Sequence, residues 1–420
     1  MSTLKLAFRN ILRNRRRSLL TALSASVAVL VLVVATGFIG GVETDSVKSY
    51  LTTRTAHIKV YAAGYPYNDE SLPLDQALSP AQQSRLVDAG RDVGRAVGRP
   101  IGRTVSGLKM APRLLFSASL IKDGEELMAL GAGVDPQADP AVLEAPGRLA
   151  RRLTDPRGIL VGSDLARLLH LKAGDTVTAS FRTRPGAIYA DDFTILGLVD
   201  SGNPEVDSNY FFISLGAAQD YLEMPGGATE WDIRLERPDD LSRVETALQK
   251  KLGPEFQVVS WRKQLADVLS FFDLRRKVFV IINAALFLMA VIIVANTMLM
   301  TVYERFKEIG TLMALGMKRR QILELFAAEG SLLGLLGGLA GVLIGAALIR
   351  YFSTHGVDTS GIRNRGMDIN VPIKGKLYAE LATYFYFVAV AVSGAVAGLA
   401  AMWPARKAAG LEPSEALRRN

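Results

Sequence analysis

The residue types that carry catalysis or bind metals are sparse in this chain and widely spaced. It has no cysteine and only three histidines, His57, His170 and His355. The lack of thiolates excludes a disulfide scaffold, a zinc–thiolate site, an iron–sulfur cluster and a cysteine nucleophile. No two histidines are close enough for a short metal motif, and no G-x-x-x-x-G-K-[ST], G-x-S-x-G or H-E-x-x-H occurs. We therefore expect no catalytic residue, metal site or bound cofactor in this chain, and no enzymatic activity of its own.

The most specific pattern of charge and glycine lies at 304–322, which reads ERFKEIGTLMALGMKRRQI. Glu304, Arg305 and Glu308 are mixed with an apolar set at helical spacing, and Gly316 separates two short helical stretches. The apolar set is Ile309, Leu312, Met313 and Leu315. A solvated linker has little reason to carry such a set beside glycines, whereas a docking surface for another protein does.

The chain contains four long stretches without Asp, Glu, Lys or Arg: 18–42, 278–303, 330–349 and 381–405. Two of them, 278–303 and 330–349, flank this loop. A helix needs about 20 apolar residues to cross a bilayer, and buried helices of a soluble core are usually shorter and keep a polar stripe. The first stretch could be a signal peptide, but it is longer than such an apolar region and has no clean A-x-A site. We expect a polytopic α-helical membrane protein with four transmembrane helices, at 18–42, 278–303, 330–349 and 381–403.

The flanking charges predict the orientation. Residues 1–17 contain six Lys or Arg and no acid, which favours the cytoplasmic side and an amphipathic basic helix on the membrane surface. Both termini, the loop 304–329 and the tail 404–420 are then cytoplasmic, while 43–277 and 350–380 lie outside. Arg275, Arg276 and Lys277 disagree with this orientation because they flank the second span on its outer side.

The outer segment 43–277 is long enough for a domain with its own core, and its pattern alternates strands and helices, which predicts an α+β class. A strand at 56–61 is expected to pair with a strand–helix–strand unit at 231–259. The middle, about 100–225, would then be an insertion that forms a second lobe.

Small residues recur every four positions in the last two spans. The third span has Gly330, Gly334 and Gly338, overlapped by Gly337, Gly341 and Gly345, and the fourth has Gly394 and Gly398. Such faces let helix backbones approach closely, so we expect these glycines to pack helices. No ionisable residue lies inside the spans, which weighs against a proton-coupled pump.

The inner loop resembles the E-R-x-x-E-I-G-x-L-x-A-L-G motif of FtsX-like (MacB/LolC/LolE-type) ABC transporter permeases. The matching residues are Glu304, Arg305, Glu308, Ile309, Gly310, Leu312, Ala314, Leu315 and Gly316. The tail, with Pro404-Ala-Arg-Lys-Ala-Ala and Glu412-Pro-Ser-Glu-Ala-Leu-Arg, and the basic N-terminus are also similar. Met313 departs from the family, which often has Arg there.

The resemblance implies a permease subunit of the bacterial inner membrane. Two such subunits, identical or paralogous, would pair with a cytoplasmic ATPase dimer that holds the ATP and Mg, and the loop 304–322 would dock on that ATPase. ATP turnover would move the outer domain, to extract or export a substrate such as a lipoprotein or lipid, with a periplasmic carrier or adaptor as a further partner. The alternatives are a MacB-type tripartite efflux permease and a scaffold that activates a periplasmic hydrolase. Nothing points to nucleic acid.

Overall fold

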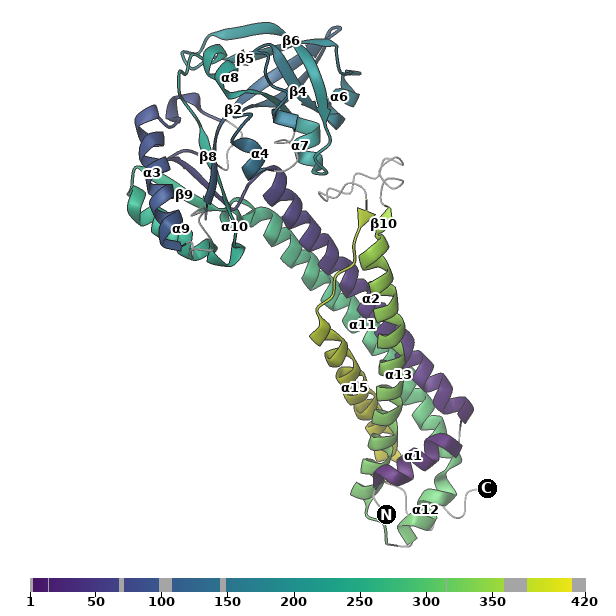
Figure 1. Cartoon of the computed structure of the whole chain (residues 1–420). Coiled ribbons are helices and arrows are strands. Elements are labelled where there is room, and N and C mark those ends of the chain that lie inside the picture. The colour runs from purple at the N-terminus through teal and green to yellow at the C-terminus, as the bar shows by residue number, and fades with distance from the viewer. Residues whose placement is uncertain are drawn as a thin grey trace. The chain divides into compact units, whose positions relative to one another are not determined.

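The computed structural model describes residues 3–13, 15–67, 72–97, 108–143, 149–314, 316–358 and 376–409. The chain divides into two compact units. We call Met1–Thr44, Phe272–Asp358 and Lys376–Asn420 the helical unit, and Asp45–Phe271 the sheet unit. Figure 1 shows the elements of both.

Six helices form the helical unit, two of which extend into the sheet unit. They are α1 (Thr3–Arg13), α2 (Arg15–Thr53), α11 (Ala266–Glu304), α12 (Phe306–Ala314), α13 (Arg319–His355) and α15 (Thr383–Ala409). A short antiparallel pair, β10 (Val357–Asp358) and β11 (Lys376–Leu377), follows α13. Four helices, α2, α11, α13 and α15, are long and apolar enough to cross a membrane.

These helices are longer than the charge-free stretches that predicted them. Helix α13 begins at Arg319, so the second half of the predicted loop 304–329 forms its first turns. Helix α15 continues past Pro404 to Ala409, so the predicted tail 404–420 begins inside a helix. At the other ends of α2 and α11, Glu43 forms an ion pair with Arg276 at 2.6 Å and lies 3.9 Å from Arg275.

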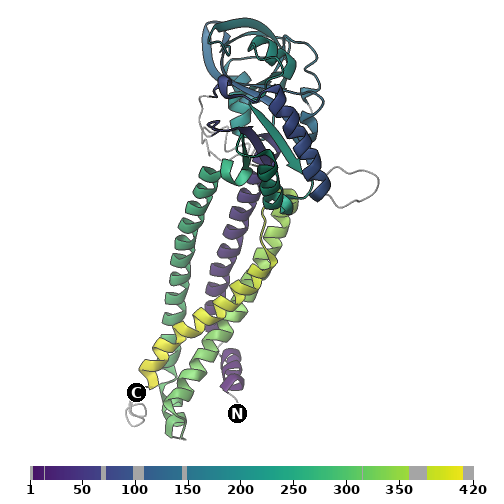
Figure 2. The same cartoon turned by 90° about the vertical axis from the view of Figure 1, so that its left-hand side faces the viewer.

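The glycines of α13 divide between two neighbouring helices. A Cβ at Gly334 would lie 2.5 Å from the Ser393 carbonyl oxygen in α15, and one at Gly341 would lie 2.5 Å from the Ser26 carbonyl oxygen in α2. Gly330 and Gly338 likewise face α15, Gly345 faces α2, and Gly394 and Gly398 of α15 face α13. Helices α13 and α15 therefore run side by side with closely spaced backbones (Figure 2).

The sheet unit is built on one nine-stranded sheet in the order β3-β7-β4-β6-β5-β2-β8-β1-β9. Its strands are β1 (Ile58–Ala62), β2 (Leu108–Lys122), β3 (Glu125–Val134), β4 (Gly158–Gly162), β5 (Thr176–Arg182), β6 (Ile188–Val199), β7 (Tyr210–Ser214), β8 (Glu230–Leu235) and β9 (Phe256–Ser260). Because β3 pairs with both β7 and β2, six strands close into a ring. Alternate residues of these strands, such as Phe116, Phe181 and Phe211, fill its interior.

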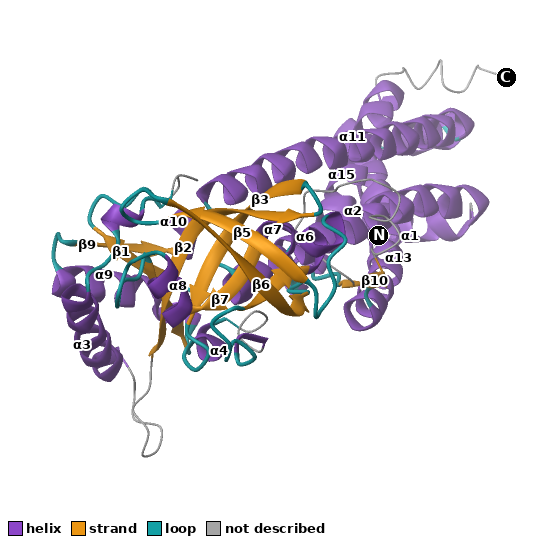
Figure 3. Cartoon of the chain, turned by 90° about the horizontal axis from the view of Figure 1, so that it is seen from above, coloured by secondary structure: helices purple, strands orange, loops and turns teal. Residues whose placement is uncertain are grey.

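The long strand β2 joins this ring to a second core. Its first half pairs with β8, and β1 pairs with both β8 and β9, which confirms the predicted pairing of the 56–61 strand. Helices α3 (Pro80–Val97) and α9 (Leu241–Leu252) lie side by side against these strands (Figure 3). The predicted insertion at about 100–225 corresponds to the ring, but it shares a continuous sheet with the rest of the unit. Short helices complete the unit: α4 (Asp139–Val142), α6 (Ser163–Leu168), α7 (Pro204–Asn209), α8 (Leu215–Tyr221) and α10 (Trp261–Gln264).

Candidate functional site

The loop singled out by the sequence forms helix α12 and the turns on either side of it. Helix α11 ends at Glu304, and α12 begins two residues later. After α12 the chain turns at Gly316, whose φ of +94° is a conformation that favours glycine. The side chain of Gln321 then accepts a hydrogen bond from the Lys318 N–H at 2.8 Å, which caps the start of α13.

A network of ion pairs connects α12 to the helices around it, and we call it the α12 cluster. Arg13 of α1 lies 2.5 Å from Glu308, while Arg305 contacts Glu308 at 2.8 Å and Glu329 of α13 at 3.4 Å. Arg17 of α2 pairs with Glu304 at the end of α11. The Asn10 side chain also donates to Glu329, at 3.5 Å. The first group of contacts joins α1, α12 and α13, and the Arg17–Glu304 pair separately joins α2 to α11.

Burial separates two kinds of contact in this cluster. The side chains of Arg305 and Glu329 are 11% and 4% exposed, whereas those of Arg13 and Glu308 are 56% and 46% exposed. At Glu308, desolvation opposes ionisation, but hydrogen bonds from Arg305 and Arg13 outweigh it and lower the pKa. Glu308 therefore stays ionised at neutral pH and keeps both guanidinium partners.

The apolar side of α12 packs within the chain. Ile309 is 5% exposed and lies with Val302, Ile322, Phe326 and Ala405, with Met313 beside them. Gly310 is also buried and Leu312 is half-buried, while Glu304, Glu308, Thr311 and Gly316 are exposed. Ile309 thus contacts its own chain rather than the groove of a partner. Leu315 and the side chain of Ala314 lie outside the described residues.

The sequence pattern pointed to Glu304, Arg305 and Glu308 but did not predict their partners. Asn10, Arg13 and Arg17 were read only as part of a basic surface helix and its flank, and Glu329 only as the last charge before a span. One signal was available, because a lone carboxylate at the start of an apolar helix needs a cation nearby. Which cation it would be depends on tertiary packing.

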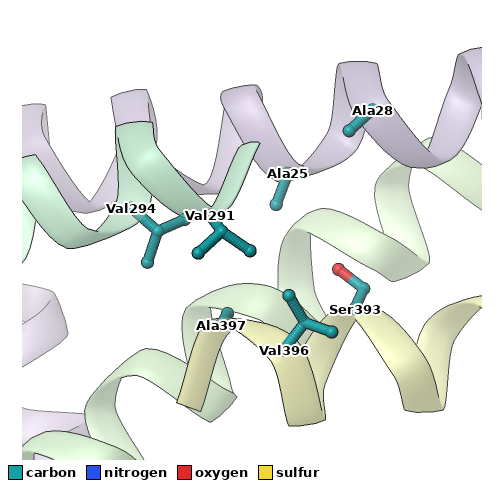
Figure 4. A pocket seen from close by; sticks show the side chains of 7 residues that line it. All are labelled: Ala25, Ala28, Val291, Val294, Ser393, Val396 and Ala397. Carbon is teal, nitrogen blue, oxygen red and sulfur yellow. The ribbon is translucent and has the colours of Figure 1, made fainter. Parts of the chain in front are cut away.

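One small apolar cavity lies among the described helices of the helical unit (Figure 4). Its volume is about 20 Å³, and it is lined by Ala25, Ala28, Val291, Val294, Ser393, Val396 and Ala397. The hydroxyl of Ser393 donates to the Gly334 carbonyl oxygen at 2.9 Å. Such a cavity has room for about one water, so it is not a substrate chamber.

His57 is a buried histidine with a structural role in the sheet unit. His57 is 8% exposed, and its Nδ1 accepts a hydrogen bond from the Leu235 N–H at 3.2 Å. Burial, with help from Arg234, lowers its pKa, so it is neutral. In the described part of the chain, no three His, Asp or Glu side chains are grouped as metal ligands.

Comparison with known proteins adds two family matches. Residues 18–251, more than half of the chain, match the model of the MacB-like periplasmic core domain. Residues 280–413 match the FtsX-like permease C-terminal model. The second match contains α12 and all of α13.

Several curated proteins are similar. The lipoprotein-releasing system transmembrane protein LolC of Xylella fastidiosa is 23% identical over 414 residues, which cover 96% of this chain and 93% of LolC. An uncharacterized ABC transporter permease of Methanocaldococcus jannaschii is 27% identical, over 54% of this chain and 55% of its own length. The macrolide export ATP-binding/permease protein MacB of Bradyrhizobium diazoefficiens is 32% identical over 36% of this chain and 22% of its own.

Among solved structures, the extracellular domain of the ABC-type transporter YknZ from Gram-positive bacteria matches with a TM-score of 0.32 and 10% identity. It covers 48% of this chain and 99% of that one. The periplasmic region of MacB from Actinobacillus actinomycetemcomitans gives a TM-score of 0.30. Neither likeness is close enough for a structural argument.

Proposed function

Because this chain belongs to the FtsX-like family of ABC transporter permeases, we propose that α12 is where a cytoplasmic ATPase dimer engages it. In this account the chain is a multi-pass membrane subunit that hydrolyses no ATP itself. Two copies, identical or paralogous, act with the ATPase, which holds the ATP and Mg. The termini and α12 face the cytoplasm, and the sheet unit lies on the other side of the membrane.

The observation that carries this proposal is the construction of the α12 cluster. Helix α12 is short, is held on its inner side by Ile309, and is joined to α1 by the Arg13–Glu308 pair and, through Arg305, to Glu329 of α13. A partner that displaces α12 would therefore displace the ends of α1 and α13, and also the end of α11, because only Arg305 separates α11 from α12. Glu308 and Thr311 remain exposed beside these contacts and provide the surface for the ATPase, while Glu304 is paired with Arg17.

We further propose that force passes along α11, from the α12 cluster to the sheet unit. Helix α11 runs from Ala266 to Glu304 without a break, so it connects the cluster covalently to the sheet unit. The cavity among α2, α11 and α15 has room for about one water. We therefore infer that ATP turnover is converted into movement of the sheet unit rather than into opening of a pore.

For the substrate class, the extent of the alignments favours one candidate. The match to LolC runs through almost all of both chains, whereas the match to MacB covers a minor part of each. This supports extraction of a lipoprotein or lipid, handed on to a periplasmic carrier, over macrolide-type efflux. A scaffold that activates a hydrolase has no specific observation behind it.

Site-specific crosslinking tests the docking proposal. A photoreactive benzoylphenylalanine at Thr311, which is exposed on α12, is expected to crosslink to an ABC ATPase in membranes that contain the native partner. The matched control is the same residue at Met128, which is 79% exposed in the sheet unit and should give no ATPase adduct. Equal adducts at both positions, or none at Thr311, would contradict docking through α12.

A further inference from the structure

Helix α1 has one side that the described chain leaves exposed, and this side combines apolar and basic residues. Phe8 and Leu12, one helical turn apart, are 53% and 51% exposed. Lys5 and Arg9 form the adjoining row of the same helix and are exposed as well. This side therefore presents two large apolar side chains directly beside two cations.

The opposite side of α1 is fixed in the core of the helical unit. Ala7 is fully buried, and Ile11 lies in an apolar cluster with side chains of α11, α13 and α15. The hydroxyl of Ser18 in α2 donates to the Ile11 carbonyl oxygen at 3.1 Å. Because these contacts set the rotation of α1, Phe8 and Leu12 cannot turn inward unless Ile11 leaves the core.

The cations of this region outnumber the carboxylates that pair with them. Residues 1–17 contain six Lys or Arg and no acid. Two of these cations are paired, Arg13 with Glu308 and Arg17 with Glu304. The other four are exposed and have no carboxylate partner among the described residues: Lys5, Arg9, Arg15 and Arg16. This excess of positive charge favours an anionic partner.

The position of α1 in the chain brings this side to the border of a membrane. Helix α2 begins at Arg15, and its charge-free stretch starts at Ser18. Leu19 and Leu20, in the first turns of α2, are 68% and 62% exposed, as expected for side chains that face lipid. Figure 1 shows α1 meeting α2 at a sharp angle, so α1 turns aside at this border instead of extending the span.

We propose that α1 binds anionic phospholipids of the membrane leaflet next to it. Phe8 and Leu12 would insert among the acyl chains, and the long side chains of Lys5 and Arg9 would reach the headgroup phosphate. A soluble phosphate would leave the two apolar side chains in water, and an apolar protein surface would leave the cations unpaired. An anionic lipid satisfies both. The proposal shares the membrane setting with the proposed function, but it needs no ATPase.

Native mass spectrometry of the full chain in one detergent tests the choice of headgroup. The chain is titrated with anionic palmitoyl-oleoyl phosphatidylglycerol (POPG) or with zwitterionic palmitoyl-oleoyl phosphatidylcholine (POPC). A cation near an anionic lipid contributes about 1 kcal/mol, roughly fivefold in affinity. The first POPG should therefore bind at least about fivefold more tightly than the first POPC.

A pair of double variants assigns this preference to α1. Lys5→Gln combined with Arg9→Gln should remove most of the preference for POPG. The matched control is Arg319→Gln combined with Arg320→Gln, which also removes two exposed cations. These two begin α13, roughly 16 Å along the helix from its charge-free stretch, and the control should keep the preference.

The depth of the apolar side chains is measured separately. The chain has no cysteine, so Phe8→Cys carries a single nitroxide label. In nanodiscs that contain POPG, power-saturation electron paramagnetic resonance should show this label to be more accessible to oxygen, which dissolves in the bilayer, than to a water-soluble nickel chelate. The label at Arg320→Cys should show the reverse. Because this measurement leaves Lys5 and Arg9 unchanged, it decides even where their double variant fails to fold.

Three results would overturn the proposal. One is equal affinity of the unmodified chain for POPG and POPC. Another is a preference for POPG that the double variant of Lys5 and Arg9 leaves intact, or that the control loses to the same extent. The third is a label at position 8 that is more accessible to the nickel chelate than to oxygen, or shielded from both, because water or protein would then cover this side of α1.

Discussion

At the scale of single residues, the α12 cluster combines contacts of very different strength. The pair of Arg305 and Glu329 is almost fully buried, and removing Glu329 would leave Arg305 with only the exposed carboxylate of Glu308. The pairs of Arg13 with Glu308 and Arg17 with Glu304 are largely exposed, so water and salt screen them. The buried pair therefore holds the helices in place, while the exposed pairs can be exchanged for contacts with a partner.

The first prediction concerns the buried pair. Glu329→Gln should lower the free energy of unfolding by about 1.5 to 3 kcal/mol, because Arg305 loses its buried counterion and keeps only Glu308. The matched control is Glu324→Gln in the same helix, whose pair with Arg320 is exposed, and its effect should stay below about 1 kcal/mol. Chemical denaturation of both variants in mixed micelles measures this difference, and equal effects would mean that the Arg305 pair is not structural.

The second prediction concerns a carboxylate of the sheet unit. Asp232 lies between Lys59 and Arg113, at 3.5 and 3.3 Å. Burial, aided by Glu230 and opposed by both cations, raises its pKa to about 7. As the pH falls from 8 to 6, Asp232 gains a proton in the folded state while the unfolded state stays ionised. The free energy of unfolding should therefore rise on acidification through this window.

The thermal midpoint of the full chain at pH 8 and pH 6 measures this effect. Asp232→Asn should flatten the difference between the two, whereas Asp220→Asn, at an exposed position, should not. Any opposite contribution from His57 is common to all three proteins and cancels in the comparison. If the thermal midpoint of the wild-type protein changes between pH 8 and pH 6 by the same amount as that of Asp232→Asn, Asp232 does not titrate in this window.

At the scale of elements, the ends of the helices determine how α12 is held. The exposed pair of Arg17 and Glu304 joins the first turn of α2 to the last turn of α11. Each single reversal, Arg17→Glu or Glu304→Arg, should reduce the ATPase activity coupled to this chain by about two- to fivefold, the equivalent of roughly 0.5 to 1 kcal/mol. The double reversal should restore it.

The rate of ATP hydrolysis by the membrane complex tests this exchange. Arg16→Glu, measured in parallel, controls for the change in net charge. The free energy of unfolding should change little in all these variants. A double variant no more active than the single ones would show that the pair does not matter for coupling.

The packing of α13 on α15 gives a further prediction. A methyl group at Gly334 would meet the Ser393 carbonyl oxygen and the Ala397 Cβ at 2.5 Å. Gly334→Ala should therefore cost about 1 to 3 kcal/mol of stability. Gly216→Ala, where a Cβ has open space, is the control. A Gly334→Ala protein as stable as the control would mean that these helices can separate at no cost.

The sequence predicted some of these elements well and others not at all, for physical reasons. Charge-free stretches of 20 or more residues predict helices because a bilayer admits little else, and α2, α11, α13 and α15 follow. The closure of the ring depends on β3 pairing with both β2 and β7, and such non-local pairing leaves no local pattern. Lys59 inside an apolar strand was a visible sign of a buried cation, but its partners Glu230 and Asp232 lie about 170 residues away.

At the scale of the whole molecule, continuous helices join the two units. Both α2 and α11 begin in one unit and end in the other. Family membership supplies the ATPase partner, the α12 cluster supplies the contact we propose for it, and α11 supplies the covalent path to the sheet unit.

Gentle affinity purification of the full chain from its native membranes, with mass spectrometry of the proteins that accompany it, shows whether an ATPase binds this chain. The account predicts recovery of an ABC ATPase with a phosphate-binding loop, in amounts comparable to the chain, and its loss on addition of 1 M salt, which screens charged contacts. Acylated proteins or lipid in the same sample would favour extraction as the activity. Recovery of no ATPase, in detergents mild enough to keep such complexes intact, would contradict the account.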